Sequence, residues 1–383
     1  MPFVVVSSSA MHLYVHIPFC RQACHYCDFH FSTSLRDKGT LVQAIATELA
    51  MQRDYLPGRE LQTVYFGGGT PSLLNETELA LLLDTIRTHF HLTPDAEITL
   101  EANPDDLSEG TLQMLVRQGI NRLSIGIQSF HEPHLRFMNR AHNAIEAERS
   151  VKAAQDAGIT NLTADLIYAI PAADDGILHQ DLQMMLALGI EHISAYCLTI
   201  EPKTVFGNWV EKKKIQPIEE EFAARQFEIL MATLRQAGFE QYEISNFARN
   251  QKYSLHNSAY WQRRPYLGVG PSAHSYKGTS RQYTIANNAA YVRGITEGTL
   301  PFTLEILSLE DQVNEYLLSG LRTQWGCRLD VLQELSEGRF LGEMEEEIFR
   351  FREKGWLQSK EGLLLLTESG KLFADRVAGS LFL

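Results

Sequence analysis

Hydrophobic residues between 12 and 200 alternate between two spacings. Short runs rich in β-branched and aromatic residues predict strands at 13–17, 63–67, 97–102, 122–127, 162–167 and 192–200. Between these runs, apolar residues recur at helical spacing around 38–55, 75–90, 107–118, 143–157 and 178–189. Strands that alternate with helices indicate a parallel sheet built from βα units. Because no phosphate-binding fingerprint follows the first strand, the pattern favours an α/β fold with a curved, barrel-like sheet over a doubly wound one.

The pattern changes twice in the second half of the chain. Residues 201–305 are less regular, with one helix expected at 218–237 and a loop-rich run of aromatic residues and histidines after it. Further on, helical patterns at 308–323, 329–336 and 342–355 lead into a short hairpin and a last helix, the outline of a winged helix. We therefore expect a tail at 1–11, a barrel domain at 12–247, a connecting region at 248–305 and a C-terminal domain at 306–383.

Composition and charge narrow the function. Hydrophobic residues make up 44% of the chain and charged residues 21%, and no apolar run reaches the roughly 18 residues of a membrane span. The net charge of -13, with 14 acidic against 9 basic residues in 307–383, disfavours a nucleic-acid partner. Five cysteines, an odd number, suit a reducing compartment, and the absence of a lysine or arginine before Arg21 argues against a signal peptide. We expect a cytoplasmic protein.

Three of the cysteines lie in "HIPFCRQACHYCDFHF", directly after the first predicted strand. Cys20, Cys24 and Cys27 have the spacing C-x3-C-x2-C. Thiolates favour zinc or iron-sulfur clusters, and both kinds of site normally have four protein ligands. Two interpretations follow. Either His25 or His30 completes a structural zinc site, or one metal position stays open for chemistry.

Polar residues also stand at the carboxyl ends of the later strands, where function gathers in parallel α/β folds. The glycines of "YFGGGTPS" allow a ligand to approach the backbone closely, although no lysine follows to make a Walker loop. Glu101, Gln128 and Asp165 belong to three successive strands, and Arg140 follows a short helix. Each residue alone is explained as a cap, a surface charge or a core hydrogen bond. Their shared position makes one common ligand the better interpretation.

Together these motifs resemble the radical S-adenosylmethionine (SAM) superfamily, in the branch that contains oxygen-independent coproporphyrinogen III oxidase and heme chaperones. The resemblance covers essentially the whole chain. It implies a partial (β/α)6 TIM-like barrel, a smaller C-terminal domain like that of the oxidase, and a [4Fe-4S] cluster on the three thiolates whose open iron binds SAM. It also implies a SAM site lined by Tyr14, Tyr26, Gly68, Gly69, Thr70, Glu101, Gln128, Arg140 and Asp165.

Two regions of the sequence bear on the choice between oxidase and chaperone, the segment up to Phe29 and the segment around His256. The oxidase pattern continues to a further cysteine and has an N-terminal extension, whereas this chain has Phe29 at that position and a first strand near residue 12. "LHNSAYW" resembles the H-N-x-x-Y-W signature of the chaperones, in His256, Asn257, Tyr260 and Trp261. A neutral imidazole can ligate heme iron and aromatic rings pack on porphyrin. Without the resemblance, a histidine among aromatic residues is better explained as a hydrogen-bonded packing residue.

The resemblance therefore implies a heme chaperone that binds heme and hands it to apoproteins such as respiratory hemoproteins, whose site of transfer can be the membrane surface. It further implies an electron donor for the cluster and allows a homodimer. As a carrier, the protein need not be an enzyme, and no catalytic residue is assigned. The alternatives are radical decarboxylation of coproporphyrinogen III and radical modification of RNA, the second disfavoured by the acidic C-terminal segment.

Overall fold

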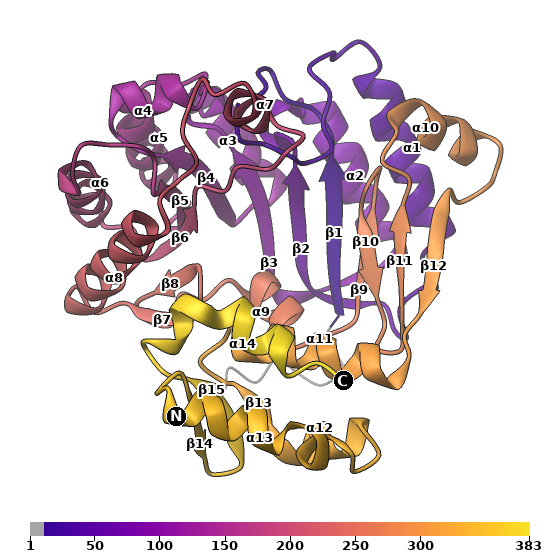
Figure 1. Ribbon diagram of the computed structural model, residues 1–383. Coiled ribbons are helices and arrows are strands. Elements are labelled where there is room, and N and C mark those ends of the chain that lie inside the picture. The colour runs from indigo at the N-terminus through magenta and orange to yellow at the C-terminus, as the bar shows by residue number, and fades with distance from the viewer. Residues whose placement is uncertain (1–10) are drawn as a thin grey trace.

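A curved sheet of six parallel strands forms the centre of the molecule (Figure 1). The computed structural model describes residues 11–383. The parallel strands, neighbours in chain order, are β1 (Met11–Ile17), β2 (Glu60–Gly68), β3 (His91–Ala102), β4 (Arg122–Gln128), β5 (Asn161–Tyr168) and β6 (His192–Cys197). They confirm the predicted α/β barrel. Of the predicted tail, residues 1–10 lie outside the described residues, and Met11 begins β1.

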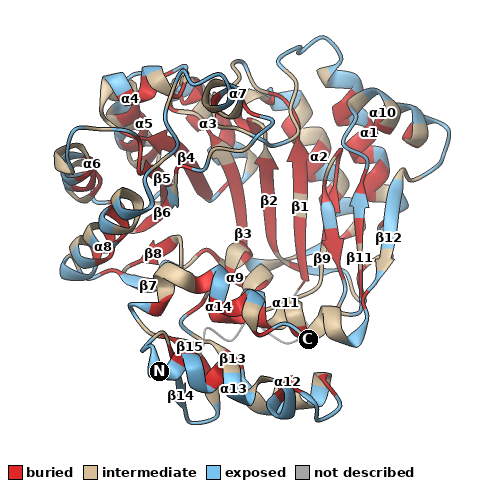
Figure 2. Cartoon of the chain, viewed as in Figure 1, coloured by how far each residue is buried: buried red, intermediate tan, exposed pale blue. Residues whose placement is uncertain are grey.

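The parallel strands have one apolar face and one polar face. In β1, Leu13, Val15 and Ile17 join the hydrophobic core beneath the helices. His12 and His16, at alternate positions, point to the other face, the hollow inside of the sheet. The strands are nearly all buried (Figure 2). Because the inside of the sheet is lined by polar side chains, its open end can hold a polar ligand.

Helices cover the outer face of the sheet. They are α1 (Lys38–Met51), α2 (Glu76–His89), α3 (Glu109–Gln118), α5 (Ala144–Asp156), α6 (Gly176–Ala187) and α8 (Glu220–Gln236). The predicted bounds of α2 and α5 are accurate to one residue because both helices begin at capping boxes, Asn75 with Glu78 and Asn143 with Glu146. Shorter helical segments lie in the loops that follow the strands: η1 (Pro71–Leu73), η2 (Pro104–Asp106), α4 (Glu132–Phe137) and α7 (Val205–Glu211).

The second half of the chain widens the sheet to twelve strands. Beside β6 lie β8 (Asn246–Ala248) and β7 (Glu240–Glu243), and beside β1 lie β9 (Tyr266–Val269), β10 (His274–Tyr276), β11 (Ser280–Thr284) and β12 (Phe302–Ile306). Helices α9 (Leu255–Trp261) and α10 (Asn288–Thr296) separate some of these strands. The expectation of a loop-rich run after residue 248 was therefore wrong. Strands of three to five residues are too short to show a period.

The last part of the chain has a hydrophobic core of its own, around residues such as Leu317, Phe340 and Leu364. Its elements are α11 (Leu309–Leu321), β13 (Cys327–Arg328), α12 (Leu329–Leu335), α13 (Phe340–Glu353), β14 (Leu357–Lys360), β15 (Leu363–Leu366), η3 (Gly370–Phe373) and α14 (Ala374–Ser380). Helices and a small antiparallel sheet confirm the winged-helix-like outline. This unit lies beneath the amino ends of the parallel strands (Figure 1). Across residues 11–383, none of the helices has the length and apolar character needed to cross a membrane.

Candidate functional site

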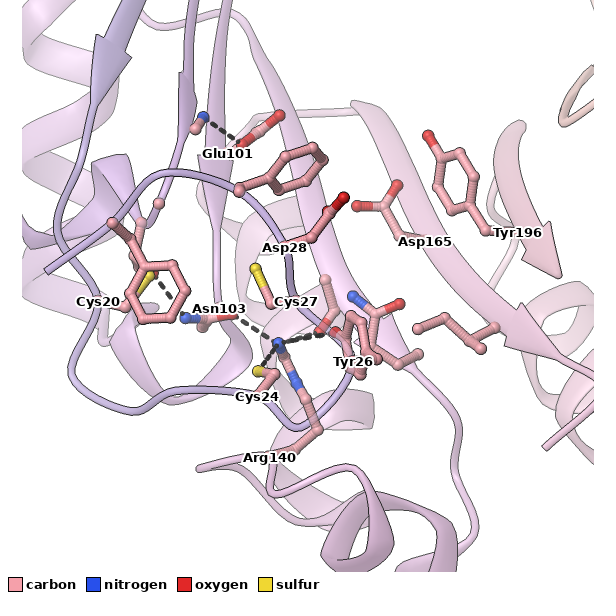
Figure 3. Close-up of a pocket in the computed structure, with 18 of the residues that line it drawn as sticks. Cys20, Cys24, Tyr26, Cys27, Asp28, Glu101, Asn103, Arg140, Asp165 and Tyr196 are labelled. Atoms are coloured by element: carbon pink, nitrogen blue, oxygen red, sulfur yellow. Dashed lines mark hydrogen bonds between the residues drawn. The ribbon is translucent and has the colours of Figure 1, made fainter. Parts of the chain in front are cut away.

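The loop after β1 brings its three cysteines to the carboxyl end of the barrel (Figure 3). A bridge between Phe19 and Ser32 closes the base of this loop. Asn139, just after α4, holds the loop from the other side, because its side-chain amide donates to the Ala23 carbonyl at 2.8 Å. All three thiols line one cavity of about 520 Å³. The loop is thus tied at both sides, and its cysteines face a common space.

Neither histidine of this loop completes a zinc site with the thiols. His25 Nδ1 lies 2.9 Å from the Phe137 carbonyl oxygen, and its ring packs on Trp209 with centroids 4.7 Å apart. His30 Nε2 lies 2.8 Å from Asn288 Oδ1. Over residues 11–383, no cluster of three His, Cys, Asp or Glu side chains is arranged to hold a single metal ion. The geometry therefore disfavours a closed site of three thiolates and one imidazole.

The thiols lie in a partly desolvated environment. Burial raises the pKa of Cys20, opposed by a hydrogen bond from Thr70 Oγ1 at 3.4 Å, and burial raises the pKa of Cys27 to about 12. Arg140 Nη1 donates to Cys24 Sγ at 3.2 Å. At neutral pH Cys27 is protonated in the absence of metal, so a metal that binds it must displace a proton.

The glycine run after β2 forms the next part of the wall. Gly68 has φ +107°, which only glycine adopts readily, and a Cβ there would lie 2.5 Å from His16 Cε1. Its backbone N–H donates to Glu101 Oε2 at 3.0 Å. Thr70, next along the wall, accepts a hydrogen bond from the Asn103 amide at 3.2 Å. The glycines therefore let strand, carboxylate and cysteine loop approach one another closely.

Arg140 is the central cation of the cavity. Its Nη2 donates to Asn103 Oδ1 at 2.6 Å and to the Gly126 carbonyl at 2.8 Å, while Nη1 faces Cys24 and Tyr26 Oη. Its Nε is buried without a hydrogen-bond partner. A buried guanidinium N–H of this kind fits an anionic ligand group such as a carboxylate.

Two carboxyl groups face the same cavity from β3 and β5. Burial, with the nearby charge of Glu101, raises the pKa of Asp165 to about 7, and Ser124 Oγ donates to Asp165 at 3.3 Å. Burial also raises the pKa of Glu101, opposed by hydrogen bonds from Tyr65 and the Gly68 amide. Since each carboxylate disfavours the charge of the other, a cationic ligand between them would be stabilised.

The structure brings most of the predicted cofactor residues together. Those that line the cavity are Cys20, Cys24, Cys27, Tyr26, Gly68, Gly69, Thr70, Glu101, Gln128, Arg140 and Asp165. Tyr14 is not among them, and its predicted contact with SAM stays a prediction. Its hydroxyl is 3.1 Å from His16 Nδ1, and its ring stacks on Tyr65 with centroids 6.1 Å apart. Tyr14 thus contacts residues next to the cavity wall.

The four residues of the H-N-x-x-Y-W signature lie elsewhere, in α9 at the opposite end of the barrel. His256 is 1% exposed. Its Nδ1 is 2.6 Å from Thr63 Oγ1 and its Nε2 is 2.9 Å from Tyr260 Oη. Asn257 is in the first turn of α9, and Trp261 ends the helix beneath the Arg322 guanidinium. Both ring nitrogens of His256 are occupied by hydrogen bonds in this structure, and the contact of the signature with heme stays a prediction.

Several cavity residues were not predicted. Asn103, Ser124 and Tyr196 line the cavity. The strand period of two residues could have identified Asn103 from Glu101 and Ser124 from Gln128, whereas Tyr196 is on β6, where no site residue was predicted. Cys197, interpreted from the sequence as a packing residue, also lines the cavity. Cys327 is fully buried, as expected. The sequence around Cys197 is apolar on both sides, so it did not indicate which face of the strand this cysteine occupies.

Comparison with known proteins agrees with this geometry. The family model "Radical SAM superfamily" matches residues 14–185. Heme chaperone HemW of Bacillus subtilis is 34% identical over 372 residues, which cover 96% of this chain and 98% of the relative, and HemW of Escherichia coli is 33% identical, with coverage of 97% and 98%. The structure of E. coli coproporphyrinogen III oxidase (HemN) superposes with a TM-score of 0.84 over 99% of this chain and 92% of that chain, at 22% identity, and shows a shared fold. The chain belongs to the HemW family of the radical SAM superfamily.

Proposed function

We propose that this protein is a heme chaperone that binds heme and transfers it to apoproteins such as respiratory hemoproteins. The observation that carries the proposal is the similarity of almost the entire chain to heme chaperones HemW, at 33–34% identity. Phe29 supports it, since this residue replaces the further cysteine of the oxidase pattern. At 68% exposure, the ring presents an apolar surface at the cavity.

The radical SAM family implies a [4Fe-4S] cluster and SAM as cofactors. In this chain Cys20, Cys24 and Cys27 would hold the cluster, which when bound supplies the electron for reductive cleavage of the SAM sulfonium. Arg140, oriented by Asn103, would bind the SAM carboxylate. Glu101 and Asp165 would accept hydrogen bonds from the SAM ammonium and ribose hydroxyls, and backbone groups at Gly68 and Gly69 would contact the methionyl part. Tyr26, Thr70 and Gln128 complete the wall.

A rim of aromatic and aliphatic residues offers a surface for the heme. Phe29 and Tyr196, the latter 45% exposed, line the cavity together with the partly buried Phe31, while Ile167 and Leu198 line it from buried positions. A porphyrin is flat and apolar, and exposed aromatic rings pack on its face. We place the heme at this rim, because His256 has no free ring nitrogen in α9.

Heme titration of the purified chain, followed by absorbance, tests the proposal. The wild-type protein should bind heme, and the double substitution Phe29→Ala/Tyr196→Ala should weaken binding about tenfold, the effect of removing apolar contacts worth about 1.4 kcal/mol. Phe349→Ala is the matched control, because this ring is 62% exposed on α13, far along the chain from the rim. A wild-type protein that takes up no heme would exclude the chaperone function.

The oxidase remains the second candidate, supported by the fold that the chain shares with HemN. Release of CO2 from coproporphyrinogen III by the reconstituted protein under anaerobic, reducing conditions would favour it over the chaperone. We further propose a cytoplasmic protein that receives electrons from a separate donor, with recipients at the membrane surface. The homodimer and the exclusion of RNA stay predictions, which light scattering and RNA titration at two salt concentrations would test.

A further inference from the structure

Two histidines lie in matching surroundings at the base of the barrel. His256 is hydrogen-bonded to Thr63 Oγ1 at 2.6 Å and Tyr260 Oη at 2.9 Å. His192 is hydrogen-bonded to Thr163 Oγ1 at 3.0 Å and Tyr242 Oη at 2.7 Å. Both are buried, at 1% and 0% exposure. The two imidazoles thus have the same kinds of partner and the same burial, and they differ in the rings that they contact.

The ring of His256 lies against Tyr65, with centroids 4.9 Å apart and planes inclined by 23°. Tyr14 stacks on both rings, at 6.1 Å from Tyr65 and 6.4 Å from His256. The hydroxyl of Tyr65 donates to Glu101 Oε1 at 2.8 Å, and the other oxygen of Glu101 accepts from the Gly68 amide at 3.0 Å. A continuous series of contacts therefore leads from His256 to the wall of the cofactor cavity.

Close packing prevents this series from relaxing freely. A Cβ on Gly67 would lie 2.9 Å from Tyr14 Cε2, 2.9 Å from Tyr65 Cε1 and 3.1 Å from Glu101 Oε1. Two rings and the carboxylate therefore crowd one glycine, and Tyr65 has little room to tilt without moving its hydroxyl away from Glu101. By contrast, the ring contact of His192 is to Tyr242, which does not line the cavity.

Helix α9 is itself held in place from two sides. Glu97 accepts hydrogen bonds from the backbone amides of Leu255 and His256, both at 3.1 Å, and its carboxylate lies 3.6 Å from Arg122 Nε. At the other end of α9, the Arg322 guanidinium lies 5.5 Å from the ring centroid of Trp261. Arg322 also pairs with Glu243 at 3.0 Å. The barrel and the segment after α11 together determine where the His256 ring lies.

We propose that His256 is a positioning residue for the SAM site: its ring supports Tyr65 from below, which aims the phenol at Glu101. The inference rests on the proposed function, since it takes Glu101 to contact SAM. On this inference the H-N-x-x-Y-W segment increases the affinity for SAM by packing against Tyr65, and it does not ligate heme iron.

SAM affinity of the full chain, reconstituted anaerobically with its cluster and measured by equilibrium dialysis of labelled SAM, tests the proposal. His256→Ala and Tyr65→Phe should each weaken SAM binding about tenfold, since one hydrogen bond to a carboxylate contributes roughly that factor. The double variant should bind SAM no more weakly than either single variant, because both act through the same hydroxyl. Tyr65→Phe retains the ring, so its result counts even where His256→Ala fails to fold.

His192→Ala is the matched control for a merely structural effect. It should lower the melting temperature as much as His256→Ala does and leave SAM affinity unchanged. His256→Phe, which restores a flat ring beneath Tyr65 without either hydrogen bond, should recover SAM affinity and not stability. Iron content should equal that of the wild type in every variant.

Three results would overturn the inference: equal SAM affinity in His256→Ala and wild type, equal loss of affinity in His192→Ala and His256→Ala, or a wild-type chain that binds no SAM. If His256→Ala lost heme uptake but kept its SAM affinity, His256 would be interpreted as a ligand of the heme iron. Failure of the wild-type chain to take up heme would refute only the chaperone function, because SAM affinity is measured without heme.

Discussion

The two ends of the barrel are built from the same strands, but they differ in how their polar side chains are satisfied and in what they surround. At the base, His192 and His256 have both ring nitrogens hydrogen-bonded, and Arg122 is paired with Glu97. At the mouth, Glu101, Asp165 and Arg140 surround a cavity of about 520 Å³. A polar lining therefore does not by itself mark a ligand site. Buried polar atoms without a hydrogen-bond partner occur at both ends, such as Arg122 Nε at the base and Arg140 Nε at the mouth, and only Arg140 lines the cavity.

Helix α9 accounts for the difference. It packs against β2 and α11 and fills the base with the imidazole of His256 and the phenol of Tyr260. No corresponding helix fills the mouth, where the loop after β1 carries the cysteines over the ends of the strands. The imidazoles of His192 and His256 at the base are fully hydrogen-bonded, whereas the carboxyl groups of Glu101 and Asp165 at the mouth have raised pKa values.

The largest expected effect is at the mouth. Replacing Cys20, Cys24 or Cys27 with serine should remove the iron of the anaerobically reconstituted protein almost completely, because a cluster with three protein ligands cannot lose another and persist. Iron analysis and visible absorbance measure this loss. Cys197→Ser is the control, since Cys197 lines the same cavity outside the C-x3-C-x2-C spacing. Loss of iron in that variant would make Cys197 a fourth ligand and contradict the open-iron interpretation.

The next effect is at the base. Arg122→Leu leaves the buried Glu97 carboxylate without its cation, which should lower the free energy of unfolding by about 3–5 kcal/mol. Denaturant titration measures the change. Arg117→Leu is matched to it, because Arg117 pairs with Glu76 on the surface and should cost less than about 1 kcal/mol. If both variants lost a similar free energy of unfolding, the pair of Arg122 and Glu97 would be no more important for stability than a surface ion pair.

The smallest expected effect is an increase in the free energy of unfolding, on replacement of Asp165. The pKa of Asp165, raised to about 7 by burial and by Glu101, lies above the value near 4 of an unfolded chain, so the folded protein loses stability as pH rises through that interval. Asp165→Asn should therefore stabilise the ligand-free protein by about 1–2 kcal/mol near pH 8 and by less near pH 5. Thermal unfolding at both pH values checks this. A stabilisation that does not depend on pH would refute the raised pKa.

Local signals in the sequence predicted much of the barrel and its site. The cysteine spacing, the glycine run after β2 and the polar residues at strand ends are set within a few neighbouring positions, and parallel strands with helical crossovers must bring their carboxyl ends to one edge. Helices with capping boxes, such as α2 and α5, were located to within one residue for the same reason. The strands β9 to β12 were not predicted, because strands of so few residues are stabilised by pairing with neighbours distant in sequence.

The cysteine loop, the order of strands and helices, and the chemistry available at the strand ends can be predicted from the chain alone, since these depend on residues close together in sequence. Long-range packing, in contrast, stacks Tyr14 on Tyr65, places Cys197 in the lining of the cavity and buries His256 in the base. Burial and orientation depend on which distant segment packs against a side chain. A histidine among aromatic residues has the same local pattern whether it awaits a heme or supports a neighbouring ring.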